Sequence, residues 1–189
     1  MVACGIDFSG RHFPKAVVLT TIRWYLRYNL SYRDVEEIIA ERGIKVDHSS
    51  VNRWVVKYAP LLAAEAQRYK RKVGISWRLD ETYIKVRGQW KYLYRAVDKE
   101  GDTIDFLLTA KRDTKAALRF LRQAIRNNGT PVKINIDKSG ANAAAILAYN
   151  QQSGDAITIR QCKYLNNIVE QDHRRVKQKP RAALGFKAF

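Results

Sequence analysis

Apolar positions in the first third of the chain recur at helical spacing. Val18 and Ile22 follow Pro14, which suits a first helical position, so a helix is expected as far as residue 28. Ser31 and Asp34 then have the form of a capping box ahead of a second apolar run. The pattern predicts that a second helix begins here and ends near residue 43.

A third helix is expected after a short turn. Asp47 or Ser49 can cap it, Trp54 belongs to its apolar face, and Pro60 is expected to end it. Residues 61–72 are predicted to form a further helix that runs into a basic linker.

The second and third helices fit a helix-turn-helix, although the turn between them is somewhat long. The outward positions of the third helix carry side chains that can contact base edges and phosphates, namely Ser50, Asn52, Arg53 and Lys57. A plain three-helix domain with a polar surface fits the same pattern equally well, and the spacing alone does not separate these two interpretations.

The character of the chain changes after residue 74, where runs of β-branched and aromatic residues begin. Three strands joined by short turns are predicted, and helices alternate with strands after them. The strands are expected at 76–86, 90–98, 103–109, 132–137 and 156–160, and the helices at about 114–127, 141–150 and 166–179. This order indicates an α/β domain with a mixed sheet, as in a ribonuclease-H-like fold. The predicted domains are therefore an all-α domain at 1–74 and an α/β domain at 75–189.

The aromatic residues of the predicted strands allow two interpretations. Trp77, Trp90, Tyr92 and Tyr94 are expected to pack in the core or on a sheet face, rather than to offer platforms on which bases stack.

Charge narrows the choice of partner. The 189 residues carry 35 Lys and Arg against 18 Asp and Glu, a formal charge of +17. A folded chain that repels itself this strongly usually binds a polyanion, for which nucleic acid is the first expectation and an anionic membrane surface the second. Two cysteines cannot form a disulfide framework, and no apolar run is long enough to span a membrane. A soluble, intracellular protein is expected.

Three acidic residues from separate elements could converge. Asp80 lies mid-strand, Asp137 ends a predicted strand, and Glu170 falls on the last helix. An acidic residue in mid-strand is costly unless it is solvated, paired or metal-bound, and three carboxylates can hold Mg²⁺ through oxygen alone. Glu81 is expected to face away from Asp80, and Asp98 begins a turn, so both are placed outside this site. Ordinary surface carboxylates remain the alternative interpretation.

Many separate motifs follow the order found in one bacterial family, and they extend over nearly the whole chain. The chain resembles the DDE transposases of insertion-sequence family six. The motifs are Gly10-Arg-His-Phe13, Trp24-Tyr-Leu-Arg-Tyr28, Ser31-Tyr-Arg-Asp34, Val46-Asp-His-Ser49, Arg53-Trp54, Trp77-Arg-Leu-Asp-Glu-Thr-Tyr-Ile-Lys-Val86, Tyr92-Leu-Tyr-Arg-Ala-Val-Asp98, Ile136-Asp-Lys138, Lys163-Tyr-Leu-Asn-Asn167, Glu170-Gln-Asp-His173 and Leu184-Gly-Phe-Lys187.

The resemblance implies roles for individual residues. Asp80, Asp137 and Glu170 match the family's catalytic, metal-binding triad. Lys177 matches the basic residue that follows the glutamate, and it could hold a DNA phosphate beside the metals. His173 is expected to contact DNA or to have a structural role, rather than to bind a metal. The implied cofactor is Mg²⁺, as two ions that Mn²⁺ can replace.

The resemblance also implies partners and a reaction. The helix-turn-helix would bind the terminal inverted repeats of an insertion sequence. The catalytic domain would nick these ends with water and join the freed 3′-hydroxyl to target DNA. A homodimer or larger assembly on double-stranded DNA is expected, in the cytoplasm of a bacterium, at the nucleoid.

The end of the chain departs from the family pattern. Family members continue past the position of Phe189 into a further helical region, and Pro180 is expected to end the last helix soon after Lys177. Two rival functions follow: a truncated transposase that binds DNA without cutting it, and a ribonuclease-H-like nuclease.

Overall fold

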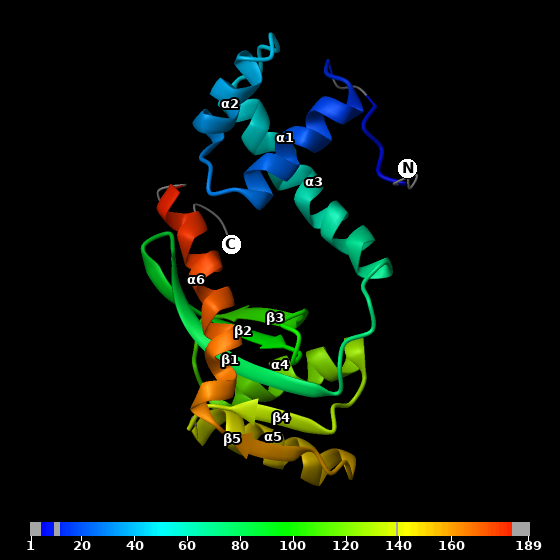
Figure 1. Ribbon diagram of the computed structural model, residues 1–189, viewed down its shortest axis with the longest axis vertical. Helices are drawn as coiled ribbons and strands as arrows, with labels where there is room; N and C mark the ends of the chain where they lie inside the picture. The colour runs from blue at the N-terminus through cyan, green and yellow to red at the C-terminus, as the bar shows by residue number, and fades with distance from the viewer. Residues whose placement is uncertain (1–4, 10–11, 139, 183–189) are drawn as a thin grey trace. The chain divides into compact units, whose positions relative to one another are not determined.

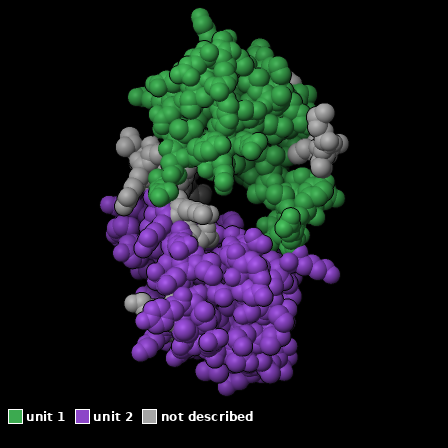
Figure 2. Space-filling model, in the orientation of Figure 1, with its two compact units in different colours: residues 1–71, 178–185 green, residues 72–177, 186–189 purple. Residues whose placement is uncertain are grey.

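The computed structural model describes residues 5–9, 12–138 and 140–182. The described chain divides into two compact units, which Figure 2 shows in different colours. The first contains the residues up to 71 together with 178–182, and the second contains 72–177. The motif at 184–187 lies outside the described residues.

Three helices build the first unit (Figure 1): α1 (Lys15–Arg27), α2 (Tyr32–Ala40) and α3 (His48–Arg68). Their apolar faces meet in one core, as the helical spacing predicts. Its fully buried side chains include Val18, Ile22, Val35, Val51 and Tyr58. The N-terminal region is therefore all-helical.

Local capping explains where these helices begin. Ser31 and Asp34 form the predicted capping box: the Ser31 N–H donates to the Asp34 carboxylate at 2.7 Å, and the Ser31 hydroxyl accepts from the Asp34 N–H at 3.2 Å. Asp47, not Ser49, caps α3 by accepting from the Ser49 N–H at 2.8 Å. Pro14 occupies the N-cap of α1 rather than its first helical position.

Both predictions that a proline would end a helix are wrong. Helix α3 continues through Pro60 to Arg68, so the helix expected separately at 61–72 is part of α3. A proline removes one backbone N–H donor and strains the preceding turn, but packing beyond it can hold the helix together. Leu62 supplies such packing, because it lies against the core of the first unit. Helix α6 likewise passes position 180 and extends to Ala182.

The second unit is built on a mixed five-stranded sheet in the order β3-β2-β1-β4-β5. Strands β1 (Ser76–Val86), β2 (Gln89–Val97) and β3 (Thr103–Thr109) form the predicted antiparallel meander. Strands β4 (Lys133–Ile136) and β5 (Thr158–Gln161) join it in parallel. Together with the helices between them, this topology confirms the ribonuclease-H-like fold.

Helices cover both faces of this sheet (Figure 1). They are α4 (Thr114–Asn128), α5 (Gly140–Ser153), the 3₁₀ turn η1 (Lys163–Asn166) and α6 (Asn167–Ala182). Tyr94 of β2 lies against Phe120 of α4, with ring centroids 5.9 Å apart. Asp80 points to the other face, where its Oδ2 lies 3.6 Å from Nδ1 of His173 on α6. Because side chains alternate between the two faces of each strand, apolar side chains of the sheet face α4 and a set of polar side chains faces α6.

The aromatic residues of the strands divide between two environments. Trp77 and Tyr94 are buried, as predicted, whereas the side chain of Trp90 is 56% exposed. Of the two predicted environments, Trp90 therefore takes the sheet face, where its ring lies against that of Tyr83, because β1 and β2 extend past their neighbours at this point. Among the described helices, none combines the length and the apolar character that a membrane span requires.

Candidate active site

The three carboxylates singled out from the sequence line one pocket. Asp80 comes from the middle of β1, Asp137 directly follows β4, and Glu170 lies in the first turn of α6. The pocket has a volume of about 270 Å³, and its remaining lining residues are Lys138, Gln161, Cys162 and Asn166.

The register of the parallel strands accounts for two of these positions. Arg78 of β1 pairs with Asn135 of β4. Asp80 and Asp137 each lie two residues further along, so they occupy corresponding positions on neighbouring strands. Adjacent strands lie about 4.8 Å apart, and side chains two residues apart share a face. The sheet therefore holds these two carboxylates side by side.

Two buried asparagines attach the third carboxylate to the sheet. Asn135 and Asn166 are 3% and 2% exposed, and the Asn135 amide donates to Oδ1 of Asn166 at 2.6 Å. The Asn166 amide donates in turn to the carbonyl of Leu79 at 3.3 Å. The Asn135 amide also reaches the carbonyl of Cys162 at 3.0 Å. We call this set of hydrogen bonds the asparagine junction.

The asparagine junction connects all three elements that carry the carboxylates. Leu79 precedes Asp80 directly, Asn135 lies two residues before Asp137, and Asn166 lies about one helical turn before Glu170. Its hydrogen bonds are buried, and each amide has lost its contact with water, so breaking one is costly. The junction therefore fixes where α6 begins relative to β1 and β4.

Burial changes the acidity of the central carboxyl group. The pKa of Asp80 is raised from 3.8 to about 7. Burial is the largest cause, and the negative charges of Glu81, Asp137 and Glu170 act in the same direction, against a backbone hydrogen bond that lowers the pKa. At neutral pH, Asp80 is thus poised between its protonated and charged forms.

His173 packs against this carboxyl group. Its side chain is buried, and burial is the main cause that lowers its pKa to about 4, with Arg95 and Lys177 acting in the same direction. The ring is therefore neutral at pH 7, and its 3.6 Å approach to Asp80 is a polar contact rather than an ion pair. The burial of His173 does not fit the DNA contact predicted for it, but it fits the structural role.

The remaining predicted neighbours of the site lie outside the pocket. Lys177 is on α6, where its ammonium group lies 4.8 Å from the ring centroid of Tyr83. Glu81 faces away from the pocket: it accepts from Arg112 at 2.6 Å and from Asn142 at 2.6 Å. Asp98 closes the β2–β3 turn by accepting from backbone N–H groups, including those of Glu100 and Asp102.

The residues predicted to contact DNA lie on one stretch of α3 in the first unit. Asn52, Arg53 and Lys57 are exposed there, and Ser50 is half-buried. The Arg53 guanidinium donates to the Ser50 hydroxyl at 2.9 Å, which orients it along the helix surface. This part of α3 therefore presents two cations and an amide to solvent.

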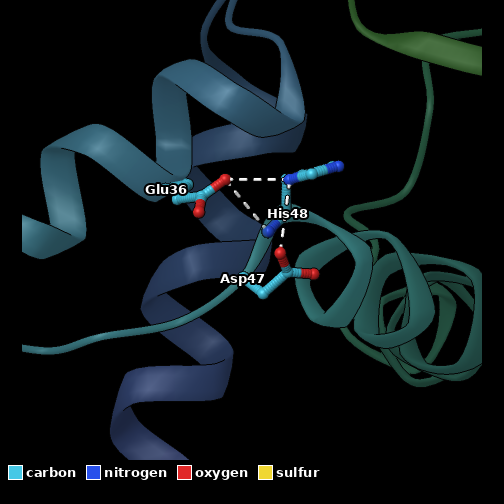
Figure 3. Close-up of side chains that lie close together, drawn as sticks. All are labelled: Glu36, Asp47 and His48. Carbon is cyan, nitrogen blue, oxygen red and sulfur yellow. Dashed lines mark hydrogen bonds and ion pairs between the residues drawn. The ribbon is translucent and has the colours of Figure 1, made fainter.

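A second acidic cluster, in the first unit, supports the start of α3 (Figure 3). The backbone N–H of His48 donates to Oε2 of Glu36 at 3.1 Å, and Nδ1 of the His48 ring lies 3.0 Å from the same carboxylate oxygen. Asp47 Oδ2 lies 3.5 Å from this Nδ1. Glu36 of α2 thus satisfies a donor at the N-terminus of α3 and holds the two helices in register.

The pocket in the second unit fits a hard divalent cation. Its three acidic side chains offer oxygen donors alone, the type that Mg²⁺ prefers, and burial together with the neighbouring carboxylates raises the pKa of Asp80. Over the ranges that the structure describes, only Glu36, Asp47 and His48 bring three possible metal-ligand atoms, from carboxylate, thiol or imidazole groups, within 4.8 Å of one another. The pocket carboxylates are spaced more widely, as suits two ions about 3.5–4 Å apart.

Sequence reasoning gave no role to the asparagine junction. Asn166 and Asn135 appeared only as parts of larger stretches, although a polar Asn135 in the apolar run of β4 was a usable signal. Cys162, to which we assigned no function, is a free cysteine whose carbonyl belongs to the junction.

The fold and the pocket together define a ribonuclease-H-like class of protein with three acidic residues at the sheet. Residues 74–189 match the family model described as a DDE domain. The chain belongs to the DDE transposases of insertion-sequence family six.

Two transposases of Staphylococcus aureus agree with this membership. The chain is 44% identical over 174 residues to the transposase for insertion sequence-like element IS431mec of Staphylococcus aureus strain Mu50, which covers 90% of this chain and 76% of the relative. It is 43% identical, with the same coverage, to the transposase for insertion sequence element IS257 in transposon Tn4003 of S. aureus. Among solved structures, the HTLV-2 integrase catalytic core domain in complex with magnesium matches 57% of this chain and 70% of its own, at 19% identity and a TM-score of 0.48.

Replacing Asn166 should loosen the site. Asn166→Ala removes the acceptor for one Asn135 hydrogen bond and the side-chain donor to the Leu79 carbonyl, so two buried hydrogen bonds of the junction are lost. We expect the free energy of unfolding to fall by about 1–3 kcal/mol in urea denaturation. Asn167→Ala is the matched control, because the neighbouring side chain is exposed. Equal effects of the two substitutions would contradict a role of the junction in stability.

The pKa of Asp80 predicts a pH dependence of stability in the metal-free chain. Between its unfolded value of 3.8 and its folded value of about 7, the folded chain holds a proton that the unfolded chain has released. This contribution is present at low pH and is lost as the pH rises through 7. Asp80→Asn keeps the shape and does not titrate, so it should be more stable than the native chain above pH 7, by up to about 4 kcal/mol.

The measurement is urea denaturation in a chelator across this pH range, with the exposed Asp102→Asn as control. The advantage of Asp80→Asn should shrink toward pH 4. An advantage that stays constant with pH would show that Asp80 titrates normally.

Proposed function

We propose that this protein binds the terminal inverted repeats of an insertion sequence and catalyses Mg²⁺-dependent nicking and strand transfer of DNA. The observation that carries the proposal is the convergence of Asp80, Asp137 and Glu170 on one pocket of a chain that belongs to a transposase family. The magnesium complex of the integrase core domain names the same metal in a protein of similar fold.

In this proposal the three carboxylates hold the metal ions. When bound, two Mg²⁺ ions would activate the attacking oxygen and stabilise the leaving oxygen of the phosphodiester. Asp80 and Asp137 would supply ligands from the rigid sheet, and Glu170 from the first turn of α6. Bound metal ions would lower the pKa of Asp80 and favour its ionised form, because positive charge stabilises the carboxylate.

Other side chains of the second unit would assist without touching the metals. His173 is buried and neutral, so it would support the position of Asp80 without adding charge. Lys177 would hold a phosphate of the bound strand, because its ammonium group lies on the helix that carries Glu170. This assigns Lys177 to DNA positioning.

In this proposal the predicted domain at 1–74 binds the repeat, and the predicted domain at 75–189 carries out cleavage and strand transfer. Asn52, Arg53 and Lys57 of α3 would enter the major groove of the repeat, with Ser50 orienting Arg53. The net charge of +17 supports double-stranded DNA as the partner for both repeat and target. Since two ends must be processed together, a homodimer or a larger assembly on DNA is proposed.

Removing any one carboxylate should abolish cleavage and spare binding. We expect Asp80→Asn, Asp137→Asn and Glu170→Gln to reduce Mg²⁺-dependent nicking of a labelled repeat-end duplex by at least about 10³-fold, because each removes a charge that holds the ions. Binding of the same duplex should stay near the native level. Asp102→Asn, an exposed carboxylate of the β2–β3 turn, should nick normally.

The same assay separates the rival functions. A native chain that binds the repeat and never nicks it acts as a DNA-binding protein alone. A native chain that cleaves random duplex as readily as the repeat acts as a nuclease. Nicking by Asp80→Asn at the native rate would refute the metal-binding assignment.

Arg53 should contribute to recognition of the repeat. Arg53→Ala in the full chain should weaken repeat binding by about 1–3 kcal/mol and reduce the preference for the repeat over random DNA, because a base contact carries sequence information. Arg68→Ala removes an equal charge near the C-terminal end of α3 and is the matched control. Competition binding measures both; a uniform loss for repeat and random DNA would show that Arg53 contacts phosphate only.

A further inference from the structure

The β1–β2 hairpin extends beyond the rest of the sheet as a two-stranded arm. Strand β4 pairs with β1 only from Ser76 to Arg78, and β3 pairs with β2 only from Tyr92 onward. Residues 84–91 therefore have no third strand beside them, and Figure 1 shows the hairpin reaching past its neighbours. A two-stranded ribbon is marginally stable by itself, so its side chains must support it.

Two aromatic side chains of this hairpin are exposed together. Tyr83 and Trp90 lie edge to face, with ring centroids 5.1 Å apart and an interplanar angle of 88°. Their side chains are 55% and 56% exposed. The diagonal pair stabilises the ribbon, yet each ring leaves much of its surface in water. Two adjoining exposed rings form a contiguous apolar patch, which is a feature of binding surfaces.

Cations accompany both rings. The Lys85 ammonium group lies 5.6 Å from the Trp90 centroid, and that of Lys177 lies 4.8 Å from the Tyr83 centroid. We name Tyr83, Lys85, Trp90 and Lys177 the aromatic–lysine patch. Lysines over the rings make the patch positive and disfavour an apolar or cationic partner. Its chemistry, rings plus positive charge, fits a nucleic acid strand.

The patch lies at a defined distance from the carboxylates. The Cα atom of Tyr83 is three residues along β1 from that of Asp80, or about 10 Å at the rise of a strand, and this odd separation directs the two side chains to opposite faces of β1. Lys177 is seven residues along α6 from Glu170, again about 10 Å at the helical rise. Lys177 contacts Tyr83, so the path along β1 and the path along α6 end at the same place. About three stacked nucleotides, at about 3.4 Å each, span such a distance.

We infer that the aromatic–lysine patch binds the bases of an unpaired DNA strand that leads away from the carboxylate pocket. Bases inside a duplex already stack on one another, whereas unpaired bases offer a free face to Tyr83 and Trp90. Lys85 and Lys177 would hold the adjacent phosphates. The inference rests on the proposed function, because cleavage at the pocket is what would release such a strand.

The test measures binding of a fluorescently labelled oligodeoxythymidylate of about 12 nucleotides to the full chain. Trp90→Leu and Tyr83→Leu should each weaken binding by about 10-fold, since stacking on one aromatic ring is lost. Trp90→Phe keeps a stacking ring and should bind within about 3-fold of the native chain. The control is Phe106→Leu, because Phe106 is 55% exposed on β3 beside Asp105 and outside the patch.

Two further readouts separate stacking from loss of fold. The oligonucleotide should quench tryptophan fluorescence much more in the native chain than in Trp90→Leu, because Trp90 is the exposed one of the four tryptophans, whereas Trp54 and Trp77 are buried and Trp24 is half-buried. Lys85→Gln should lower the salt dependence of binding by about one phosphate contact and leave the quenching at saturation unchanged. Retained binding by Trp90→Phe shows that the arm folds.

Several outcomes would overturn the inference. Equal losses for Trp90→Leu and Phe106→Leu, or no loss in either, exclude a specific stacking site. If Trp90→Leu converts a dimer into a monomer without changing affinity per chain, the patch joins two copies of the protein instead. If the native chain nicks repeat ends but Trp90→Leu binds the single strand as tightly as the native chain does, the inference fails and the proposed function stands. If it neither binds nor nicks repeat duplex, the proposed function fails first.

Discussion

The hydrogen bonds of Asn166 are the constraint on which the candidate site depends. Three carboxylates repel one another, and nothing in their own chemistry would bring them to one pocket. Parallel pairing places Asp80 beside Asp137, but Glu170 comes from a helix that could start elsewhere. Asn166 prevents this, because it bonds to Asn135 of β4 and to the Leu79 carbonyl of β1 at the same time. A buried amide that both accepts and donates a hydrogen bond specifies one arrangement and penalises the others.

The same arrangement explains the electrostatics of the pocket. Burial and neighbouring carboxylates raise the pKa of Asp80, while burial lowers the pKa of His173 beside it. Both groups are therefore driven toward their neutral forms, which lowers the cost of burying them without a counter-ion. The chain as a whole is strongly basic, with a net charge of +17. The protein thus combines a locally acidic pocket with a globally positive field, which suits metal ions inside and a polyanion outside.

Local patterns predicted most of the elements. The bounds expected for β1 and β3 are those observed, and the capping box of Ser31 and Asp34 begins α2 as expected. These features depend on neighbours in sequence: alternation for a strand, a side-chain acceptor for a helix start. Local rules failed at Pro60, because packing of α3 beyond the proline outweighs one missing hydrogen bond. They also left open whether Trp90 lies in the core or on a sheet face, because burial depends on whether a third strand lies beside the β1–β2 hairpin, and no local pattern records that.

The sequence by itself determined the family, the order of the elements and the three acidic residues, since motifs and periodicity are written along the chain. Only the tertiary structure decided which groups share an environment. It placed His173 in the interior rather than on a DNA-facing surface, assigned Asn135 and Asn166 to a common junction, and set Lys177 over Tyr83. These pairs are separated by tens of residues in most cases, and contact between them depends on strand register and helix packing. Both are properties of the whole fold, because each is fixed by the summed burial and hydrogen bonding of many residues at once.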